Sequence, residues 1–564
     1  MTRFRWLALF LAALAASCAP AEKRRAAAPL AEPRETNGIR TIGSSFLRRR
    51  GGVFEARFAG APYERGYARG RLLYDQIAAG EKDLEFLLAR MVPSPWKRWA
   101  LREILAWTMR RSDRWVGREH EEEIAGMADA EFPDPVPGAW KPYARQFALH
   151  FLHDFTQRFT DTMPLAGACS GFAAGSASTA DGHVYLARDF DFEAGPQFDR
   201  EKIVGAVVPD SGHAYLSVSF GGLTGVVSGF NDAGLGLSIH ALTGGPTSGA
   251  GEPSALLAAD VLQRDATVDQ AIARIRAARV LVSDLYLLAD ATGALAVVEK
   301  TPRATGVRRG AGWISATNLA RTPEVVRFVG RPPSYSTAAS RQARLDELLS
   351  ARSGRLDAAA AVAILRDRNA PGGARLGPGN RNAIDALIAC HSVVFDLTAR
   401  RAYVAAAPHT LGAYAAFDLA LLAAAAPEDP RFAKLDAASI PADPLLASGE
   451  YARYRRARQL NRLAREELSR GKPADAERDA SSALGSSPDF LEALVCRGEA
   501  RWRLGKKIAA EADFDSASRL SPGPPDFAAQ VERVRRDLRE GRAPGRLVSF
   551  PLSLEDILDE NQRQ

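Results

Sequence analysis

The pattern of hydrophobic and polar positions changes several times along this chain. From about residue 60 to residue 159, apolar residues recur at helical spacing, and phenylalanines stand four apart at 147, 151, 155 and 159. That spacing predicts one buried helix face with its aromatic side chains packed in a core. A short strand is predicted just before these helices, at 53–58.

Between about residues 169 and 417 the pattern becomes one of short apolar runs separated by Gly, Asp and Asn turns, typical of antiparallel strands. Helical spacing returns between the strand blocks. The predicted strands are 203–208, 214–220, 223–230, 234–240, 285–289, 295–299, 392–395 and 402–406, and the predicted helices are 258–278, 338–349 and 358–366. A strand block, a helix pair and a second strand block predict an α+β fold with two sheets and helices outside them.

A third pattern occupies residues 445–540, where small residues and prolines recur at a spacing of 34. The recurring pairs are Gly471 and Gly505, Ala476 and Ala510, Ala483 and Ala517, and Pro488 and Pro522. Small residues at helix crossings and a proline ending each unit resemble tetratricopeptide repeats. Two such units are fewer than the roughly three usually needed to bury a core, so a capping helix at 527–539 or the preceding domain is expected to cover them. Residues 541–564 form a polar tail.

Residues 1–18 have the layout of an export signal. Arg3 and Arg5 precede an apolar run at 6–16, and Ala-Ala-Ser stands directly before Cys18. This ending resembles the signal of bacterial lipoproteins and predicts a lipid anchor at Cys18, on the exported side of a bacterial envelope membrane. The alternative is a plain signal peptide cleaved near residue 16. Residues 19–40 are predicted to be a flexible tether.

Composition narrows the classes of function. The net charge of +7 comes largely from scattered arginines, and no basic block is interleaved with aromatic residues, which argues against a nucleic-acid partner. Four cysteines are too few and too dispersed for a disulfide framework or a zinc site. His150, His153 and Asp154 share one helix, but their spacing alone is weak support for a metal. No metal and no cofactor are therefore predicted.

The residues that carry chemistry gather around Cys169. Small residues follow it, a turn at Asp181-Gly182 comes next, and a short strand then ends in Arg188 and Asp191. A thiol reacts as its thiolate, and a nearby guanidinium and a proton acceptor both raise the thiolate fraction. We predict that Cys169 is a nucleophile and that Arg188 and Asp191 fold back onto it. A plain ion pair between Arg188 and Asp191 is the structural alternative.

These residues resemble the penicillin-acyltransferase-like family (acyl-coenzyme A:6-aminopenicillanic-acid or isopenicillin-N acyltransferase type) of cysteine N-terminal-nucleophile (Ntn) hydrolases. Choloylglycine hydrolases and acid ceramidase are relatives of that family. The resemblance implies that the precursor cuts itself between Ala168 and Cys169. It also implies a helical pro-segment at 41–168 and an αββα catalytic domain at 169–425.

Two phrases of the pro-segment and two departures bear on this resemblance. GAPYERGYARG at 60–70 and EEEIAGMADA at 121–130 resemble the pro-segment of the family. Asp189 stands where the family usually has asparagine, which puts a local contact in question. Ala168 stands where glycine is common, which bears on the rate of self-cleavage.

The resemblance also implies roles for three residues further along the chain. Asn231, in GFNDAGLGLS, matches an asparagine whose loop helps to stabilise the oxyanion, and Asn318, in ISATN, matches one whose amide faces the tetrahedral intermediate. Arg341, in STAASRQARLDEL, matches an arginine near the nucleophile. The structural alternatives are a turn for Asn231 and a solvated helix face for Arg341. Glu299 and His391 fall in family-like phrases and receive no chemical role from them.

The prediction is a self-processing amide hydrolase or acyltransferase that acts on a linear amide through a Cys169 thioester. The α-amine freed by cleavage would serve as the base, because its pKa of about 7.7–8.0 suits proton transfer near neutral pH. A papain-type enzyme using Cys169 and His391 is a second hypothesis, and it needs no backbone cleavage. The third is a lipid-anchored scaffold with a non-catalytic Ntn-like domain, whose repeats bind a protein partner. Cys390 and Cys496 are predicted to be buried and inert.

Overall fold

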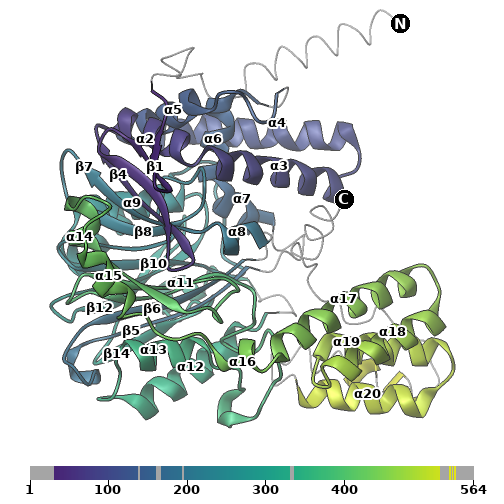
Figure 1. Ribbon diagram of the computed structural model, residues 1–564. Coiled ribbons are helices and arrows are strands. Elements are labelled where there is room, and N and C mark those ends of the chain that lie inside the picture. The colour runs from purple at the N-terminus through teal and green to yellow at the C-terminus, as the bar shows by residue number, and fades with distance from the viewer. Residues whose placement is uncertain are drawn as a thin grey trace, which may run out of the picture.

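The computed structural model describes residues 31–137, 140–159, 167–192, 196–330 and 336–520, with 532–534, 536–537 and 539–540 near the C-terminus. In these residues the chain forms two β-sheets packed face to face, helices on their outer faces, and a group of helices at the C-terminal end (Figure 1). The predicted signal with Cys18, most of the predicted tether and the predicted polar tail lie outside the described residues.

The larger sheet has eleven strands in the described part of the chain, in the order β1-β2-β3-β4-β7-β8-β9-β10-β11-β12-β13. Neighbours are antiparallel except β4 and β7, which run parallel. The strands are β1 (Arg34–Thr36), β2 (Ile39–Ile42), β3 (Ser45–Arg50), β4 (Val53–Gly60), β7 (Ile203–Pro209), β8 (Tyr215–Ser219), β9 (Ser228–Asn231), β10 (Leu235–Ala241), β11 (Asp284–Asp290), β12 (Leu295–Lys300) and β13 (Thr305–Arg309).

The smaller sheet is antiparallel throughout, in the order β14-β5-β6-β15-β16-β17. Its strands are β14 (Trp313–Ala316), β5 (Gly167–Ala174), β6 (Tyr185–Phe192), β15 (Ala389–Asp396), β16 (Arg401–Ala405) and β17 (Tyr414–Asp418). The hairpin β5–β6 carries Cys169, Arg188 and Asp191, and it lies beside β15 near the middle of this sheet.

Alternating side chains hold the layers together. In β11, Leu285 and Leu287 belong to the core between the two sheets, whereas Tyr286 and Leu288 pack against α9 (Ser254–Arg264) and α10 (Val268–Ala277). Helices α12 and α13 pack on the smaller sheet, so the order of layers is helix, sheet, sheet, helix. A strand whose two faces are both buried has this period of two. The prediction of two sheets with helices outside them agrees with this arrangement.

Most predicted elements correspond to observed ones, with two differences. The predicted strand 223–230 is only the short β9, because the residues before it form a loop. The predicted helix 258–278 is two helices, and the Thr267 side chain caps the second by accepting from the Gln270 N–H.

The helices that precede β15 in the chain are α2 (Pro62–Leu72), α3 (Tyr74–Met91), α4 (Pro95–Ser112), α5 (Arg118–Ala130), α6 (Pro142–His150), α7 (Leu152–Phe159), α8 (Pro196–Arg200), α9 (Ser254–Arg264), α10 (Val268–Ala277), α11 (Pro323–Val326), α12 (Ala338–Arg352) and α13 (Ala358–Leu365).

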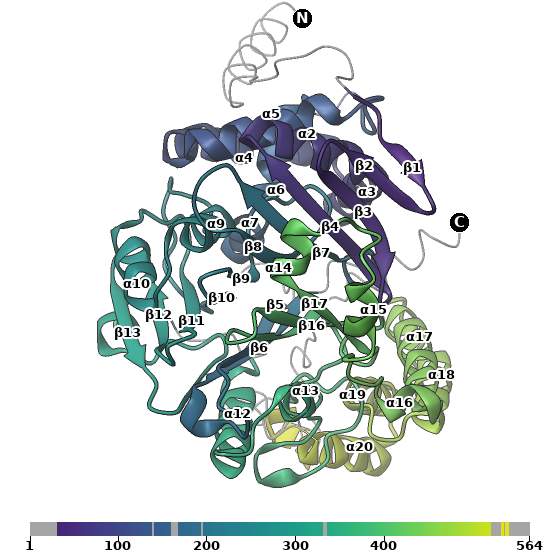
Figure 2. The ribbon, with the colours of Figure 1, turned by 60° about the vertical axis from the view of Figure 1, so that its left-hand side comes forward.

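The C-terminal helices form two helical hairpins, α17–α18 and α19–α20, which lie to one side of the sheets (Figure 2). Helices α18 and α20 begin 34 residues apart, and the alanines predicted at the crossings are buried. The predicted period thus corresponds to a repeated helical hairpin, and the predicted capping helix falls mostly on residues not described. The helices of this end are α14 (Leu419–Ala424), α15 (Arg431–Asp436), α16 (Pro444–Ala447), α17 (Glu450–Ser469), α18 (Pro473–Ser486), α19 (Leu491–Arg503) and α20 (Lys507–Arg519).

The segment before Cys169 is not the purely helical pro-segment that was predicted. Strands β1–β4 precede its helices, and β2, β3 and β4 lie inside the larger sheet. The predicted tether at 19–40 is therefore too long, because β1 begins at Arg34. The predicted strand 53–58 lies within β4.

Two tight turns explain why this region is a meander of strands. Asn37 and Gly38, between β1 and β2, have φ of 52° and 74°, and Gly51 and Gly52, between β3 and β4, have φ of 59° and 82°. Two successive residues with positive φ form the hairpin turn whose twist matches that of the flanking strands. The Asn-Gly and Gly-Gly pairs were the sequence signals for these hairpins.

Helices α2 and α5 pack at very short range through glycines. A Cβ on Gly66 would lie 1.9 Å from the Glu123 carbonyl oxygen, and one on Gly126 would lie 2.2 Å from the Tyr63 carbonyl oxygen. Each glycine is therefore required by the close approach of the other backbone. Gly66 lies in the family-like phrase at 60–70 and Gly126 in the one at 121–130, so the two phrases form one helix contact.

The predicted aromatic stripe lies in the core. Phe147 and Phe151 are fully buried, and their rings are 5.2 Å apart. The ring of Phe155 continues the stack at 5.5 Å from that of Phe151. The stripe spans two helices instead of one, since α6 ends at His150 and α7 begins at Leu152.

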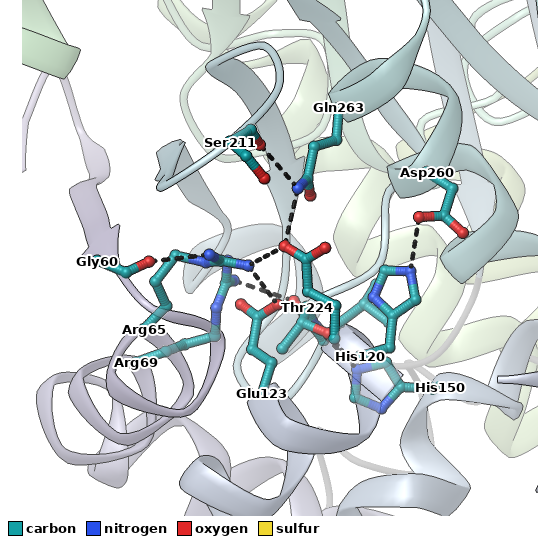
Figure 3. Close-up of polar contacts among 12 residues, drawn as sticks. Gly60, Arg65, Arg69, His120, Glu123, His150, Ser211, Thr224, Asp260 and Gln263 are labelled. Atoms are coloured by element: carbon teal, nitrogen blue, oxygen red, sulfur yellow. Dashed lines mark hydrogen bonds and ion pairs between the residues drawn. The ribbon is translucent and has the colours of Figure 1, made fainter. Parts of the chain in front are cut away.

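Buried polar contacts join the N-terminal helices to helix α9, which follows Cys169 in the chain (Figure 3). Nε2 of His120 lies 3.4 Å from Oδ1 of Asp260, and Nε2 of Gln263 donates to Oε1 of Glu119 at 2.8 Å. Burial disfavours the His120 cation, but the Asp260 carboxylate outweighs it and raises the pKa of His120. Removing one partner of a buried pair would leave an uncompensated charge.

Two further N-terminal side chains hold the loop between β8 and β9. Arg69, fully buried, donates to the carbonyl oxygen of Leu223 at 3.0 Å. The His150 ring donates from Nδ1 to the Gln146 carbonyl, so its Nε2 accepts from the Thr224 hydroxyl at 2.8 Å. Burial lowers the pKa of His150 to about 3, so this ring is neutral. The N-terminal segment is therefore part of the folded core.

We expect the two pieces of a chain cut before Cys169 to stay together. The parallel pairing of β4 with β7 and the buried contacts above cross the cut, and none of them needs the Ala168–Cys169 bond. Gel filtration of the cut protein should give one peak containing both fragments, which separate only in denaturant. Cys169→Ala, which is predicted to stay whole, is the control for the elution volume. An N-terminal fragment that elutes alone under native conditions would contradict this expectation.

Candidate active site

Cys169 is the third residue of β5 and is almost fully buried, at 3% exposure. It stands opposite Phe190 of β6, and the hairpin register brings Arg188 to the same side of the sheet. Nη2 of Arg188 donates to Sγ of Cys169 at 3.1 Å. Burial raises the pKa of the Cys169 thiol, and the Arg188 guanidinium opposes that rise. Of the two residues predicted to fold back onto Cys169, Arg188 therefore contacts its sulfur.

The guanidinium of Arg188 is fixed by the larger sheet. Its nitrogens donate to the carbonyl oxygens of Val227 and Ile239, at 3.0 and 2.6 Å, and to the Ser228 hydroxyl at 2.5 Å. All of these partners are uncharged, so the sulfur is placed against a buried positive charge. An anion at Sγ is the charge that would complement it.

His391 lies on the far side of Arg188 from the thiol. Its Nε2 is 2.9 Å from the Ser228 hydroxyl and 3.4 Å from Nη1 of Arg188. Burial holds its pKa well below the usual value, and Arg188 lowers it further. In the described part of the chain the hydrogen-bond contacts of Sγ go to Arg188 and, at 4.0 Å, to the Ile239 carbonyl. The papain-type arrangement, with His391 hydrogen-bonded to the thiol, is therefore wrong.

Asn318 and Arg341 hold the backbone of the nucleophile. The Cys169 N–H donates to Oδ1 of Asn318 at 3.0 Å, and Nη1 of Arg341 donates to the Cys169 carbonyl at 2.6 Å. Nη2 of Arg341 also donates to Oδ1 of Asn318, at 2.9 Å. Arg341 is buried on α12, so its position is not the solvated helix face of the structural alternative.

The hydrogen bonds of Asn318 define the orientation of its side-chain amide. Its oxygen, not its nitrogen, faces the Cys169 nitrogen, and Nδ2 donates to the Ala241 carbonyl at 2.9 Å. An amide nitrogen carries two hydrogens. The second has no acceptor among the described residues, and Asn318 lines the cavity beside the thiol.

Asp191 lies opposite Ala168 in the β5–β6 register, beside the bond predicted to be cut. One of its carboxylate oxygens, Oδ2, is buried without a hydrogen-bond partner. Burial raises the pKa of Asp191 to about 7, against the opposing influence of Arg341. No ion pair between Arg188 and Asp191 is found in the described residues, so the simple ion-pair interpretation does not hold.

Asp189, the departure from the family pattern, is fully buried and bonded to the Ser392 hydroxyl. Burial and the nearby Asp191 carboxyl raise its pKa well above the usual value. A protonated carboxyl has one donor and one acceptor oxygen, as an asparagine amide has. The substitution therefore keeps the hydrogen-bonding character of the expected side chain.

Asn231 is not part of this site, which corrects its predicted role. Its amide donates to the carbonyl oxygens of Leu262 and Asp265, at 2.8 and 2.7 Å, and its oxygen accepts from the Leu235 N–H at 2.9 Å. These bonds fasten the β9–β10 turn to the end of α9. The motif Asn-Asp-Ala-Gly is turn chemistry, and the turn interpretation is the correct one.

A cavity of about 160 Å³ opens in front of Cys169. Its wall combines strand ends with helices α3, α6 and α7 from before the nucleophile. Most of its lining is apolar, including Leu84, Leu149, Leu152, Phe190, Phe192, Phe198, Phe220, Leu223 and Ile388. The sequence did not indicate these residues as a group, because they come from separate segments of the chain.

No group of metal-ligating side chains is found in the described part of the chain. Both ring nitrogens of His150 are hydrogen-bonded, one to the Gln146 carbonyl and one to the Thr224 hydroxyl. Asp154 instead bonds the Ser254 hydroxyl at 3.2 Å. The spacing of these residues reflects packing.

Residues 178–408 match the family model described as acyl-coenzyme A:6-aminopenicillanic acid acyl-transferase. The match includes Arg188, Asp191 and Asn318 and begins after Cys169. A protein of Archaeoglobus fulgidus, described as uncharacterized, is 25% identical over 261 residues, which are 43% of this chain and 42% of that protein. The chain thus spans about two fifths of the length of this curated relative.

Three solved structures overlap the chain at low similarity. The Caenorhabditis elegans ortholog of N-acylethanolamine-hydrolyzing acid amidase has a TM-score of 0.31 and 14% identity, over 41% of this chain and 93% of that one. Penicillin V acylase from Agrobacterium tumefaciens has a TM-score of 0.29 and 18% identity, over 42% and 83%. A mutant form of conjugated bile acid hydrolase from Clostridium perfringens has a TM-score of 0.27 and 14% identity, over 42% and 88%.

Asp191 should make the uncut chain less stable at neutral pH than at acid pH. Its folded pKa, about 7, exceeds the unfolded value of about 3.9, so the folded state is penalised as pH rises between these values. In a Cys169→Ala background, Asp191→Asn should raise the melting temperature by several degrees at pH 8 and leave it unchanged below about pH 3.9.

Asp75→Asn is the control for this measurement, because that carboxyl is 71% exposed. It should change the melting temperature little at either pH. An Asp191→Asn chain no more stable than its parent at pH 8 would show that the carboxyl is already satisfied.

Proposed function

We propose that this chain is a self-processing cysteine Ntn enzyme that hydrolyses a linear amide or transfers its acyl group. The observation that carries the proposal is that three atoms of Cys169 are each held separately. Arg188 donates to its sulfur, Asn318 accepts from its nitrogen, and Arg341 donates to its carbonyl oxygen. A buried structural cysteine needs no such set of contacts.

This geometry supports the proposal of self-cleavage, in which the thiol proton passes to the Cys169 nitrogen. The Cys169 sulfur attacks the Ala168 carbonyl carbon, the peptide C–N bond breaks, and the acyl group passes to sulfur as a thioester. Water then releases the Ala168 carboxylate and restores the thiol. The new α-amine remains near Oδ1 of Asn318 and the Asp191 carboxylate. Proximity supports such an intramolecular step without a second protein.

The same atoms serve the reaction with substrate. The α-amine takes the thiol proton, Arg188 stabilises the thiolate, and the sulfur attacks the substrate carbonyl. On this proposal, the second Nδ2 hydrogen of Asn318 donates to the developing oxyanion. The amine product leaves with the proton, and water or another amine then takes the acyl group from sulfur.

The acyl part of the substrate is apolar on this proposal. Phe190, Phe192, Phe198 and Phe220 form one aromatic cluster beside Cys169, with rings 4.7 to 6.2 Å apart. Burying an acyl chain there removes apolar surface from water, at about 25 cal/mol per Å². Octanoyl or phenylacetyl amides should therefore react faster than acetyl amides.

We predict that Cys169→Ala stays whole and inactive, whereas the wild-type chain yields a fragment beginning at Cys169. Asn318→Ala should lower kcat by roughly a hundredfold or more with a smaller change in KM. Intact mass and turnover of aminomethylcoumarin amides with acetyl, octanoyl and phenylacetyl groups measure both effects.

Cys496→Ala, which removes a buried thiol in the C-terminal helices, is the matched control and should keep wild-type activity. A wild-type chain that turns over amides without being cut would contradict the Ntn mechanism. Absence of both cutting and turnover would favour the scaffold hypothesis.

We also propose that Cys18 carries a lipid anchor at a bacterial envelope membrane. No helix in the described residues is long and apolar enough to span a bilayer. Stable anchoring by lipid requires more than one acyl chain. Cys18→Ser should move the protein from the membrane fraction to the soluble fraction. A freely soluble wild-type protein whose first residue is not Cys18 would overturn this proposal.

A further inference from the structure

One loop connects the cavity to the C-terminal helices. Residues 376–388, called the cavity loop below, lead into β15. Arg381, Ala386 and Ile388 line the cavity in front of Cys169. Leu387, between two of these, is fully buried in the hydrophobic cluster formed mainly by α17–α20. Neighbouring residues of one stretch of chain therefore belong to two different parts of the molecule.

The conformation of Leu387 depends on its surroundings. Its φ is +52°, a left-handed value that is unfavourable for a bulky side chain and persists where packing enforces it. Its N–H donates to Oδ1 of Asp385 at 3.1 Å, and Oδ2 of Asp385 accepts from Arg368 at 2.7 Å. Arg368 also donates to Asp443, which caps α16 just before the hairpins, at 2.7 Å.

The hairpins touch the cavity loop at two more points. A Cβ on Gly379 would lie 2.0 Å from the hydroxyl oxygen of Tyr454 on α17, so the loop backbone rests directly against that ring. Nδ2 of Asn380 donates to the carbonyl oxygen of Leu520, just after α20, at 2.7 Å. The first and last helices of the group therefore both hold the loop.

The cavity loop also carries charges that act on the candidate site. After burial and Arg341, the next largest influences on the Asp191 carboxyl are Asp385, which raises its pKa, and Arg381, which lowers it. A shift of the loop would therefore change both the shape of the cavity and the charge around Asp191.

We propose that the C-terminal helical hairpins complete the substrate site. They hold the cavity loop in the conformation that forms one wall of the cavity, and Tyr454, Gly379 and Leu387 are the positioning residues for that wall. This inference rests on the proposed function for the identity of the substrate as an acyl amide. It assigns the hairpins a role in affinity and acyl selectivity, apart from any partner they bind.

The first test compares two truncations on the same helix. Tyr454→Ala should raise KM for an octanoyl aminomethylcoumarin amide about tenfold, leave kcat within about twofold, and weaken the preference for octanoyl over acetyl. Leu463→Ala, at a residue 42% exposed on α17, should change none of these values. Tyr454→Phe keeps the ring and should keep the wild-type KM.

A second pair leaves the helices untouched. Gly379 and Gly372 both have positive φ, 76° and 80°, but only a side chain at Gly379 meets another residue within 4 Å. Gly379→Ala should therefore reproduce the rise in KM, whereas Gly372→Ala should not. The difference between the two isolates the contact with Tyr454 from backbone strain.

Hydrogen–deuterium exchange separates this inference from the proposed function. Peptides covering 384–390 should exchange faster in Tyr454→Ala and Gly379→Ala than in their controls, whether or not an amide is turned over. Unchanged exchange, KM and acyl preference in both variants of an active enzyme would overturn the inference alone. A wild-type chain that neither cuts itself nor turns over amides would overturn the proposed function. Hydrogen–deuterium exchange of the variants would then still show whether the C-terminal hairpins hold the cavity loop.

Discussion

The guanidinium of Arg188, which is buried without a carboxylate partner, determines the electrostatic surroundings of the Cys169 thiol. Burying a charge is costly unless hydrogen bonds and an opposite charge compensate it. Arg188 donates its hydrogen bonds to carbonyl and hydroxyl groups on the side of the larger sheet. The opposite charge would have to come from Cys169 of the smaller sheet, as its thiolate. The packing of one sheet on the other and the reactivity of the sulfur thus depend on the same side chain.

The acidic groups nearby follow from the same low-dielectric surroundings. Asp189 and Asp191 face away from Arg188 in the alternation of β6, and burial favours their protonated forms. Asp189 accepts a hydrogen bond from the Ser392 hydroxyl on one oxygen, and each of the two carboxyls has one buried oxygen without a hydrogen-bond partner. On the proposed function, an α-ammonium group at Cys169 would give the Asp191 carboxyl, which lies opposite Ala168, an opposite charge.

The sequence predicted best what lies close together along the chain. Cys169 and Arg188 meet because a hairpin pairs residues symmetrically about its turn, and spacing alone indicates that. Asn318 and Arg341 reach Cys169 from 149 and 172 residues away, and only the resemblance to a family pointed to them. Asn231 was misassigned because an asparagine that builds a turn and one that faces an intermediate look alike in sequence. The cavity wall was not predictable, since its residues share nothing but their final position.

The contacts of Cys169 also bear on when the proposed cleavage would occur relative to folding. The residues that hold its nitrogen and carbonyl are made long after it during synthesis, and Arg341 lies on α12, which packs on β5 and β14 of the smaller sheet. A nascent or misfolded chain therefore has the nucleophile without its supports. On the proposed mechanism, a chain would cut itself only after it has folded, and the fraction cut would be a permanent record of successful folding.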